Sequence, residues 1–126
     1  MKGFTLIELL IVIVIVAVLA VIALPLYRTY ILKSNRTDAL ATLLQIENAQ
    51  ENYRISQSQY ATLTQLGISS TTPKGYYTIA INFPTTTGYT ITATANGNQI
   101  NDTNCTTISI VVSNGVETKS PTTCWQ

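Results

Sequence analysis

The hydrophobic residues of the chain are concentrated near its N-terminus. Between Leu9 and Tyr27 there is no charged residue, and most positions are Leu, Ile, Val or Ala. A run of about 19 such residues has the length at which an α-helix crosses the hydrocarbon layer of a membrane. The pattern therefore predicts a membrane-spanning helix that is apolar on every side.

This apolar run could be a cleaved secretory signal or a retained anchor. A secretory signal has a shorter apolar core, followed by a cleavage site made of small residues. Here the helical pattern continues through the far end of the run, so a cut after it would divide one helix. We therefore expect the segment to be retained. Glu8 stands at its N-terminal edge, where a carboxylate is costly unless it reaches water or a partner.

Pro25 lies inside the helical pattern. It removes one backbone donor and crowds the carbonyl oxygen of Val21, and both effects bend a helix. The alternative is that Pro25 ends the helix. Because helical periodicity resumes immediately after it, we predict a bend at Pro25.

From about residue 28 to residue 57 the apolar positions become periodic. They recur every seven residues, with one further Leu on the same side: Leu32, Ala39, Leu43, Ile46 and Tyr53. The charged side chains are expected to fall largely on other faces: Arg36, Asp38, Glu47, Glu51 and Arg54. One apolar face of this kind is suited to pack on a sheet. The sequence thus predicts one helix of about 50 residues, with its first half in lipid and its second half on a globular domain.

Strands follow a polar connection over residues 56–75, which Gly67, Pro73 and Gly75 interrupt. Three runs have the alternation of half-buried strands, and they lie at residues 77–83, which end at Phe83, at 89–95 and at 107–112. The turn signals are Asn96-Gly97 and Asn114-Gly115, and the second leads into a short last strand near residues 116–119. Strands this close in sequence favour an antiparallel meander. The predicted fold class is α+β, with about four strands packed on the amphipathic half of the helix.

The composition excludes several classes of chemistry. The chain has 126 residues, no His, 2 Cys and a net charge of +1. Without His, neither Ser–His nor Cys–His catalysis is available, and two Cys supply too few ligands for a zinc site. No clustered acids follow Glu51. We therefore expect no metal site, no cofactor and no enzyme activity.

The two cysteines, Cys105 and Cys124, lie close together near the C-terminus. Cysteines downstream of a membrane segment favour a disulfide, because the segment implies export to an oxidising compartment. Two buried free thiols are the alternative. Trp125, beside Cys124, is better explained as a packing anchor of the tail than as a ligand platform.

Nucleic-acid binding would require a basic surface, often flanked by aromatic residues. After residue 27 there are six basic and five acidic side chains, and no basic stripe. The downstream candidates are Lys74-Gly75-Tyr76-Tyr77 and Lys119. Tyr76 and Tyr77 are better explained as parts of a strand, so this interpretation ranks below a structural role.

The segment Gly3-Phe4-Thr5-Leu6-Ile7-Glu8 resembles the class III signal of type IV pilins and related pseudopilins. A small residue, a Phe and an acid four residues after the Phe all precede the apolar run. Pro25 also falls where these proteins commonly have a helix-bending proline. The tail, with Asp102, Cys105, a strand and Cys124-Trp125, is similar to the disulfide-bounded region of type IVa pilins, and most of all to small minor pilins.

The resemblance implies a division into a leader at 1–3, a transmembrane and filament-core helix at 4–27, and a globular pilin domain at 28–126. A prepilin peptidase on the cytoplasmic side would cut before Phe4, whose new amine would then be N-methylated. Gly3 would be required for this cut. The leader is shorter than the family leads us to expect, so the natural start could also lie upstream of Met1.

The resemblance also implies how subunits would join. Glu8 of an incoming subunit would pair with the Phe4 amine of a subunit already in place, and this pairing would set the axial register. The alternative is that Glu8 only marks the end of the membrane span as an interfacial charge.

In function, the resemblance implies a structural subunit, major or minor, of a type IV pilus for twitching motility, adhesion or DNA uptake. It would lie in the bacterial inner membrane as a single-pass protein with a periplasmic C-terminal domain, and then in the extracellular filament. Its partners would be other pilin subunits, of the same or another kind, prepilin peptidase and the inner-membrane assembly platform.

Two other functions remain open at this stage. One is a pseudopilin of a type II secretion system, although the C-terminal region offers only Asp102 and Glu117 for the calcium-binding acidic loop of major pseudopilins. The other is a DNA-receptor pilin for natural transformation, with nucleic acid as a partner, which the sparse basic residues do not favour.

Overall fold

The computed structural model describes residues 1–82 and 84–126, and these form two compact units, Met1–Ile31 and Leu32–Gln126. The helix α1 (Leu6–Gln57) has 52 residues and belongs to both units. It continues through Pro25, so the alternative that Pro25 ends the helix is wrong, and the bend there stays a prediction.

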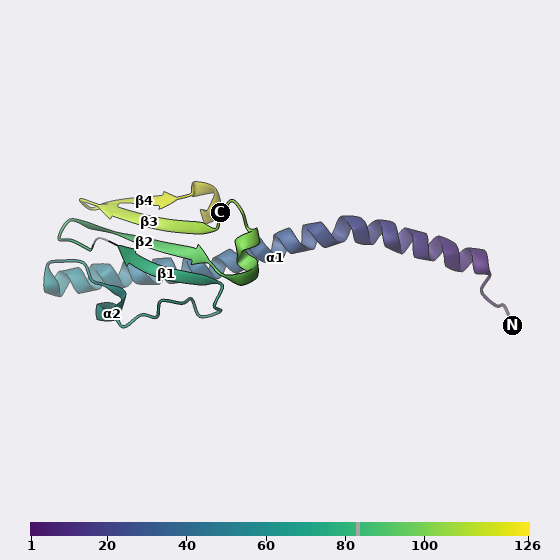
Figure 1. Cartoon of the computed structure of the whole chain (residues 1–126), viewed down its shortest axis with the longest axis horizontal. Helices are drawn as coiled ribbons and strands as arrows, with labels where there is room; N and C mark the ends of the chain where they lie inside the picture. Colours follow the sequence, from purple (N-terminus) through teal and green to yellow (C-terminus); the bar gives the residue numbers. More distant parts are fainter. Residues whose placement is uncertain (83) are drawn as a thin grey trace. The chain divides into compact units, whose positions relative to one another are not determined.

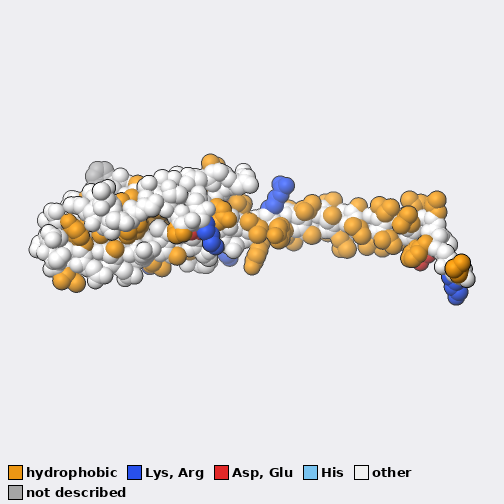
Figure 2. All heavy atoms as spheres, turned by 90° about the horizontal axis from the view of Figure 1, so that it is seen from below, with side chains coloured by type: hydrophobic (Ala, Val, Ile, Leu, Met, Phe, Trp, Pro, Cys, Tyr) orange, Lys and Arg blue, Asp and Glu red, His pale blue; other side chains and the backbone are white. Residues whose placement is uncertain are grey.

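The first unit consists of helix and a short N-terminal segment, and its apolar side chains are exposed. The exposed fraction of Phe4 is 79%, and that of Leu19 is 61%. Figure 2 shows hydrophobic side chains along this part of the helix. Among the described residues, α1 is the one helix long and apolar enough to cross a membrane. Such a surface needs lipid or other apolar helices around it.

The second unit contains a four-stranded antiparallel sheet with the order β1-β2-β3-β4 (Figure 1). Its strands are β1 (Tyr77–Asn82), β2 (Gly88–Ala95), β3 (Thr107–Ser113) and β4 (Val116–Ser120). The predicted meander is confirmed, whereas Phe83 lies outside the described residues. Asn114 and Gly115 form the last turn with φ values of 51° and 81°, the left-handed pair that an Asn-Gly hairpin turn requires.

One face of the sheet packs on the second half of α1. Alternate strand residues are buried there, among them Ile79, Ile91 and Ile110, together with Leu43 and Ile46 of α1. The opposite face is rich in hydroxyl groups and carries no charge, and its residues include Thr78, Thr92, Thr94, Thr107, Ser109 and Thr118. The sheet therefore has one apolar and one neutral polar face, as strand alternation predicts.

The packed face of α1 is more polar than its sequence pattern predicts. Asp38 and Thr42 are buried there beside Ala39, so the expectation that Asp38 lies on another face is wrong. One carboxylate oxygen of Asp38 accepts a hydrogen bond from the backbone N–H of Lys74 at 3.4 Å, and the Thr42 hydroxyl donates to the Asp38 carbonyl at 2.8 Å. Polar groups are tolerated in a core when such partners replace water.

The connection between α1 and the sheet is also more ordered than its composition suggests. Gln50 is fully buried, and its side chain both donates to the carbonyl and accepts from the N–H of Ala61, each at 2.7 Å. Thr62 and Gln65 then form a reciprocal capping box for the short helix α2 (Leu63–Leu66). The Thr-x-x-Gln spacing marks this helix start, whereas four residues are too few for periodicity to reveal it.

The C-terminal part contains two 3-10 turns and a disulfide. They are η1 (Gly97–Asn101), after β2, and η2 (Thr122–Trp125), after β4. The disulfide joins Cys105 to Cys124, and both cysteines are buried, so the prediction of a disulfide is confirmed. Trp125 packs against the core, as predicted for an anchor of the tail.

The two edges of the sheet differ. The β1 edge is covered by the preceding chain, since Thr71 bridges to Thr78 and the Ser70 carbonyl accepts from the Ile79 N–H at 2.7 Å. The strand β4 forms the other edge. It carries Glu117 and Lys119, and charged residues of this kind discourage pairing with a foreign strand.

Candidate functional site

The residues of the N-terminal signal lie before α1 and in its first turn. The Thr5 hydroxyl accepts a hydrogen bond from the backbone N–H of Glu8 at 3.3 Å, which caps the helix. Thr5-x-x-Glu8 has the spacing of a capping box, and a carboxylate in the first turn also interacts favourably with the helix dipole. Thr5 therefore caps the helix start through the backbone of Glu8, a contact that the apolar pattern alone does not reveal.

Phe4 and Glu8 are the residues that the pilin resemblance assigns to subunit contacts. Both side chains are exposed, and four residues separate them, about one helical turn. The pairing of Glu8 with the Phe4 amine of another subunit stays a prediction.

Gly3 is expected to be required for processing. A Cβ built on Gly3 would meet no atom within 4 Å, so nothing within the chain demands glycine there. A peptidase must bring the backbone before Phe4 close to its catalytic groups, and glycine has no side chain in the way. We expect Gly3→Val to insert normally and to accumulate as uncut precursor, as measured by the intact mass of the membrane-fraction protein. Gly3→Ala is the matched control and should retain cleavage, and a normal Phe4 N-terminus in Gly3→Val would contradict the prediction.

The globular unit has as many acidic as basic side chains, so its net charge is zero. Its basic residues are Lys33, Arg36, Arg54, Lys74 and Lys119. Its acidic residues are Asp38, Glu47, Glu51, Asp102 and Glu117. What this surface can bind therefore depends on which cations already have partners.

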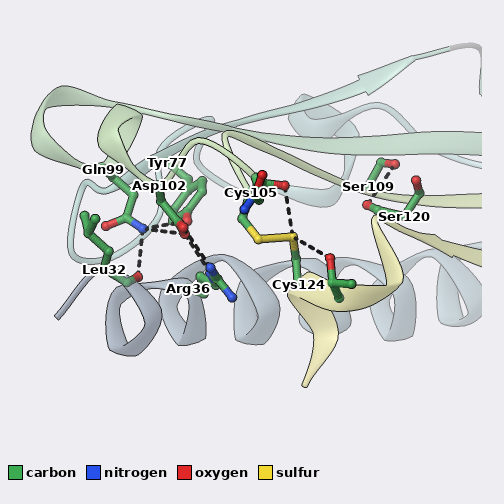
Figure 3. Close-up of a disulfide and its surroundings, with 11 residues drawn as sticks. Leu32, Arg36, Tyr77, Gln99, Asp102, Cys105, Ser109, Ser120 and Cys124 are labelled. Carbon is green, nitrogen blue, oxygen red and sulfur yellow. Dashed lines mark hydrogen bonds and ion pairs between the residues drawn. A yellow bond between two sulfur atoms is a disulfide. The ribbon is translucent and has the colours of Figure 1, made fainter. Parts of the chain in front are cut away.

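Arg36 is held in a buried polar network (Figure 3). Its Nε and Nη2 donate to the two carboxylate oxygens of Asp102 at 2.6 and 2.7 Å. The Gln99 amide donates to the same carboxylate at 3.3 Å, to the Tyr77 hydroxyl at 3.0 Å and to the Leu32 carbonyl at 2.9 Å. The hydrogen bonds to Asp102 raise the pKa of Arg36 further. Arg36 thus ties α1 to η1 and β1, and it is not free to bind an anion.

Arg54 and Lys119 also have partners. The Arg54 guanidinium donates to the Tyr60 hydroxyl at 2.6 Å and lies 4.9 Å from the centroid of that ring. The Lys119 ammonium lies 2.7 Å from a carboxylate oxygen of Glu117 and 5.1 Å from the centroid of the Trp125 ring. The predicted candidate Lys119 is therefore largely neutralised.

Lys33 and Lys74 are exposed, and across residues 1–82 and 84–126 neither has an ion pair. Lys74 stands in a tight turn, which closes when the Gly75 N–H donates to the Thr72 carbonyl at 2.9 Å. One carboxylate oxygen of Asp38 accepts a hydrogen bond from the backbone N–H of Lys74, and this contact supports the turn. The turn thus presents the Lys74 side chain on a fixed stretch of backbone.

The aromatic part of the predicted Lys74-Gly75-Tyr76-Tyr77 candidate offers little surface to a ligand. Tyr77 is fully buried in β1, and Tyr76 is half-buried against the core. The interpretation as strand residues is therefore confirmed for Tyr77 and wrong for Tyr76, which lies just before β1. The surface offers two free ammonium groups among many neutral hydroxyl groups, which can contact phosphates but hold them weakly without more cations.

Two protein-family models match the chain. The model described as "Type IV minor pilin ComP, DNA uptake sequence receptor" matches residues 25–109, which is more than half of the chain. The model described as "Prokaryotic N-terminal methylation motif" matches residues 1–24. The first match includes Lys33, Arg36, Lys74 and Cys105 but stops before Cys124.

Proposed function

Since the chain belongs to the family of ComP-type minor pilins of the type IV pilus, we propose that its globular unit binds double-stranded DNA during uptake. The chain is a type IV pilus subunit involved in DNA uptake, and the family is structural. This membership separates it from the pseudopilins of secretion systems. It also favours the DNA-receptor interpretation, which the amino-acid composition ranked low. The match over residues 25–109 is the observation that carries the proposal.

The prepilin motif and the exposed apolar helix fit anchoring in the inner membrane before assembly into the pilus. Membership implies assembly with other pilins and processing by prepilin peptidase. Our further proposals are a leader at residues 1–3, a membrane and filament-core helix at 4–27, and a globular domain at 28–126 on the periplasmic side. Cleavage would precede Phe4, which would then be methylated.

The distribution of charge supports Lys33 and Lys74 as the phosphate contacts. Both ammonium groups are exposed and without an ion pair in the described part of the chain, whereas Arg36 and Lys119 are in ion pairs and the Tyr60 hydroxyl and ring hold Arg54. Binding to DNA releases about one counterion for each phosphate that a cation neutralises. Two free lysines therefore give a weak affinity with a shallow salt dependence, and neutral hydroxyl and amide groups must supply the rest.

We expect the logarithm of the DNA affinity to fall with the logarithm of salt concentration with a slope of about −2. The measurement is fluorescence anisotropy of a labelled duplex with the full chain in detergent micelles, over a series of NaCl concentrations. Lys74→Ala and Lys33→Ala should each make the slope shallower by about 1. A selection from a random duplex library should enrich one short motif if the chain reads sequence as its family name describes.

Lys119→Gln is the matched control, because it removes the same charge from a site where the cation is already paired. Its slope should equal that of the unaltered chain. Absence of binding at low salt would refute DNA binding by this subunit alone. Binding whose slope does not change in either lysine variant would place the phosphate contacts elsewhere.

A further inference from the structure

The turn η1 divides its side chains between the interior and the surface. A 3-10 helix has about three residues per turn, so residues three apart lie on the same side. Gln99 and Asp102 are such a pair, and both are buried in the network with Arg36 (Figure 3). Asn98 and Asn101 form the neighbouring pair, and both are exposed. The network thus holds η1 by its buried side and leaves two asparagine side chains at the surface.

The exposed side of η1 has unused hydrogen-bonding capacity beside an apolar group. The Asn101 side-chain amide donates to the Asn98 carbonyl at 3.0 Å, and its side-chain oxygen has no partner within residues 1–82 and 84–126. The Asn98 side chain makes no hydrogen bond in the same part of the chain. Between them Ile100 has an exposed fraction of 57%. A side-chain amide pairs with N6 and N7 of adenine, and an apolar side chain contacts the thymine methyl group, so these residue types suit an A·T pair.

The two lysines without ion pairs stand next to η1 in the fold. Lys33 directly follows Leu32, whose carbonyl accepts a hydrogen bond from the Gln99 amide at 2.9 Å. Asn96, the residue before η1, donates from its backbone N–H at 2.8 Å to the carbonyl two residues after Lys74. In complexes with DNA, contacts to phosphates position the protein and contacts to base edges specify the sequence. Both kinds of group therefore meet at this end of the globular unit.

The acidic side chains that contact η1 or the Lys74 turn are buried. Asp102 is paired with Arg36, and Asp38 bonds to the Lys74 backbone. Glu47 and Glu51 stand on α1 roughly 20 Å or more along the helix from Lys33. A DNA phosphate at the two lysines therefore meets less opposing charge than exposed carboxylates would impose. This balance favours a polyanion over a protein as the partner of η1.

We propose that the exposed side of η1 reads A·T base pairs in the major groove of the bound DNA. The amides of Asn98 and Asn101 pair with adenine, and Ile100 contacts the thymine methyl group. Lys33 and Lys74 contact phosphates beside that groove. The major groove is about 12 Å wide and admits an α-helix, so it also admits a turn of five residues. This inference rests on the proposed DNA binding and adds the bases and the residues that read them.

The test is fluorescence anisotropy of four labelled duplexes of equal length with the full chain in detergent micelles. One duplex has alternating A and T, and another has alternating G and C. A third contains 7-deazaadenine, which lacks the N7 acceptor, and a fourth contains uracil, which lacks the thymine methyl group. We expect the A·T duplex to bind roughly fivefold or more tightly than the G·C duplex, and each modified duplex to lose part of this preference.

The variants assign each lost group to its side chain. The double variant Asn98→Ala with Asn101→Ala should bind the adenine and 7-deazaadenine duplexes equally, and Ile100→Ala should bind the thymine and uracil duplexes equally. Both should retain the affinity for the G·C duplex and the salt slope, because no charge is removed. Asn82→Ala and Val116→Ala are the matched controls. They remove the same kinds of group from exposed positions at the end of the sheet away from η1, and should behave as the unaltered chain does.

The outcomes separate this inference from the proposed function. Equal binding of all four duplexes by the unaltered chain would overturn the reading by η1 and leave DNA binding intact. Sensitivity to 7-deazaadenine that persists in the double variant would also overturn it, since the reading residues would lie elsewhere. An unchanged A·T preference in Ile100→Ala, with a reduced share of sheared filaments, would assign Ile100 to a contact with another pilin. No binding of any duplex at low salt would refute the proposed function and this inference with it.

Discussion

Replacing Asp102 by Ala should destabilise the globular unit by about 3 kcal/mol, the lower end of the cost of breaking a buried ion pair. The exposed fraction of the side chain is 16% for Arg36 and 8% for Asp102, so the guanidinium would lose its partner with little water to replace it. The Gln99 amide would lose one of its acceptors as well. The lower end is appropriate because Arg36 retains some solvent contact.

The measurement is urea unfolding of the full chain in detergent micelles, followed by a signal from the β-sheet. The matched variant is Arg36→Leu with Asp102→Leu, which removes both charges and leaves no unpaired ion. It should lose less stability than Asp102→Ala, since a buried pair and an apolar replacement are often nearly equal in energy. If both variants lose the same amount, the network contributes through packing and not through charge.

Glu8→Val should be cleaved and should remain stable in the membrane, yet its share of filaments should fall at least about tenfold. Removal of a charge from an apolar helix favours insertion, and the Thr5 hydroxyl still caps the helix because it bonds to the backbone of residue 8. In a filament, however, the Phe4 amine of a neighbour would lose its partner among apolar helices. Such a buried, unpaired charge costs several kcal/mol.

The measurement is co-expression of Glu8→Val with the unaltered chain and comparison of their shares in the membrane and in sheared filaments. Glu8→Gln is the control, since it retains hydrogen bonding without charge and should fall between the two. Equal shares in both fractions would reject the pairing and leave Glu8 as an interfacial charge. A mild defect would indicate a subunit with no neighbour beyond it.

Much of the fold follows from periodicity in the sequence. The repeat of apolar residues predicts α1, and alternation predicts β1, β2 and β3 within one residue at the described ends. These elements are predictable because each depends on neighbours within a few positions. The two cysteines likewise allow one disulfide, which is present.

The polar interior could not be predicted in this way. Gln50 is buried because Ala61, 11 residues away, satisfies its amide. Asp38 meets the Lys74 backbone across 36 residues through one of its oxygens, and Arg36 meets Asp102 across 66 residues. Local pattern contains no information on such distant partners. For the same reason the sequence could not show which cations are already in ion pairs, and the unpaired cations are the ones that can contact DNA phosphates.

The sequential order of the strands has a consequence for how the globular unit folds. Each strand pairs with the next one along the chain, so closing each hairpin orders few residues and requires little loop entropy. The contacts within the sheet are therefore local, and topologies of this kind form quickly. Docking onto α1 is different, because the Arg36–Asp102 contact closes 66 residues of chain at once. We expect the meander to form first and its capture by the helix to limit the rate, so that Ile91→Val in the sheet slows folding and Leu43→Ala in the helix mainly speeds unfolding.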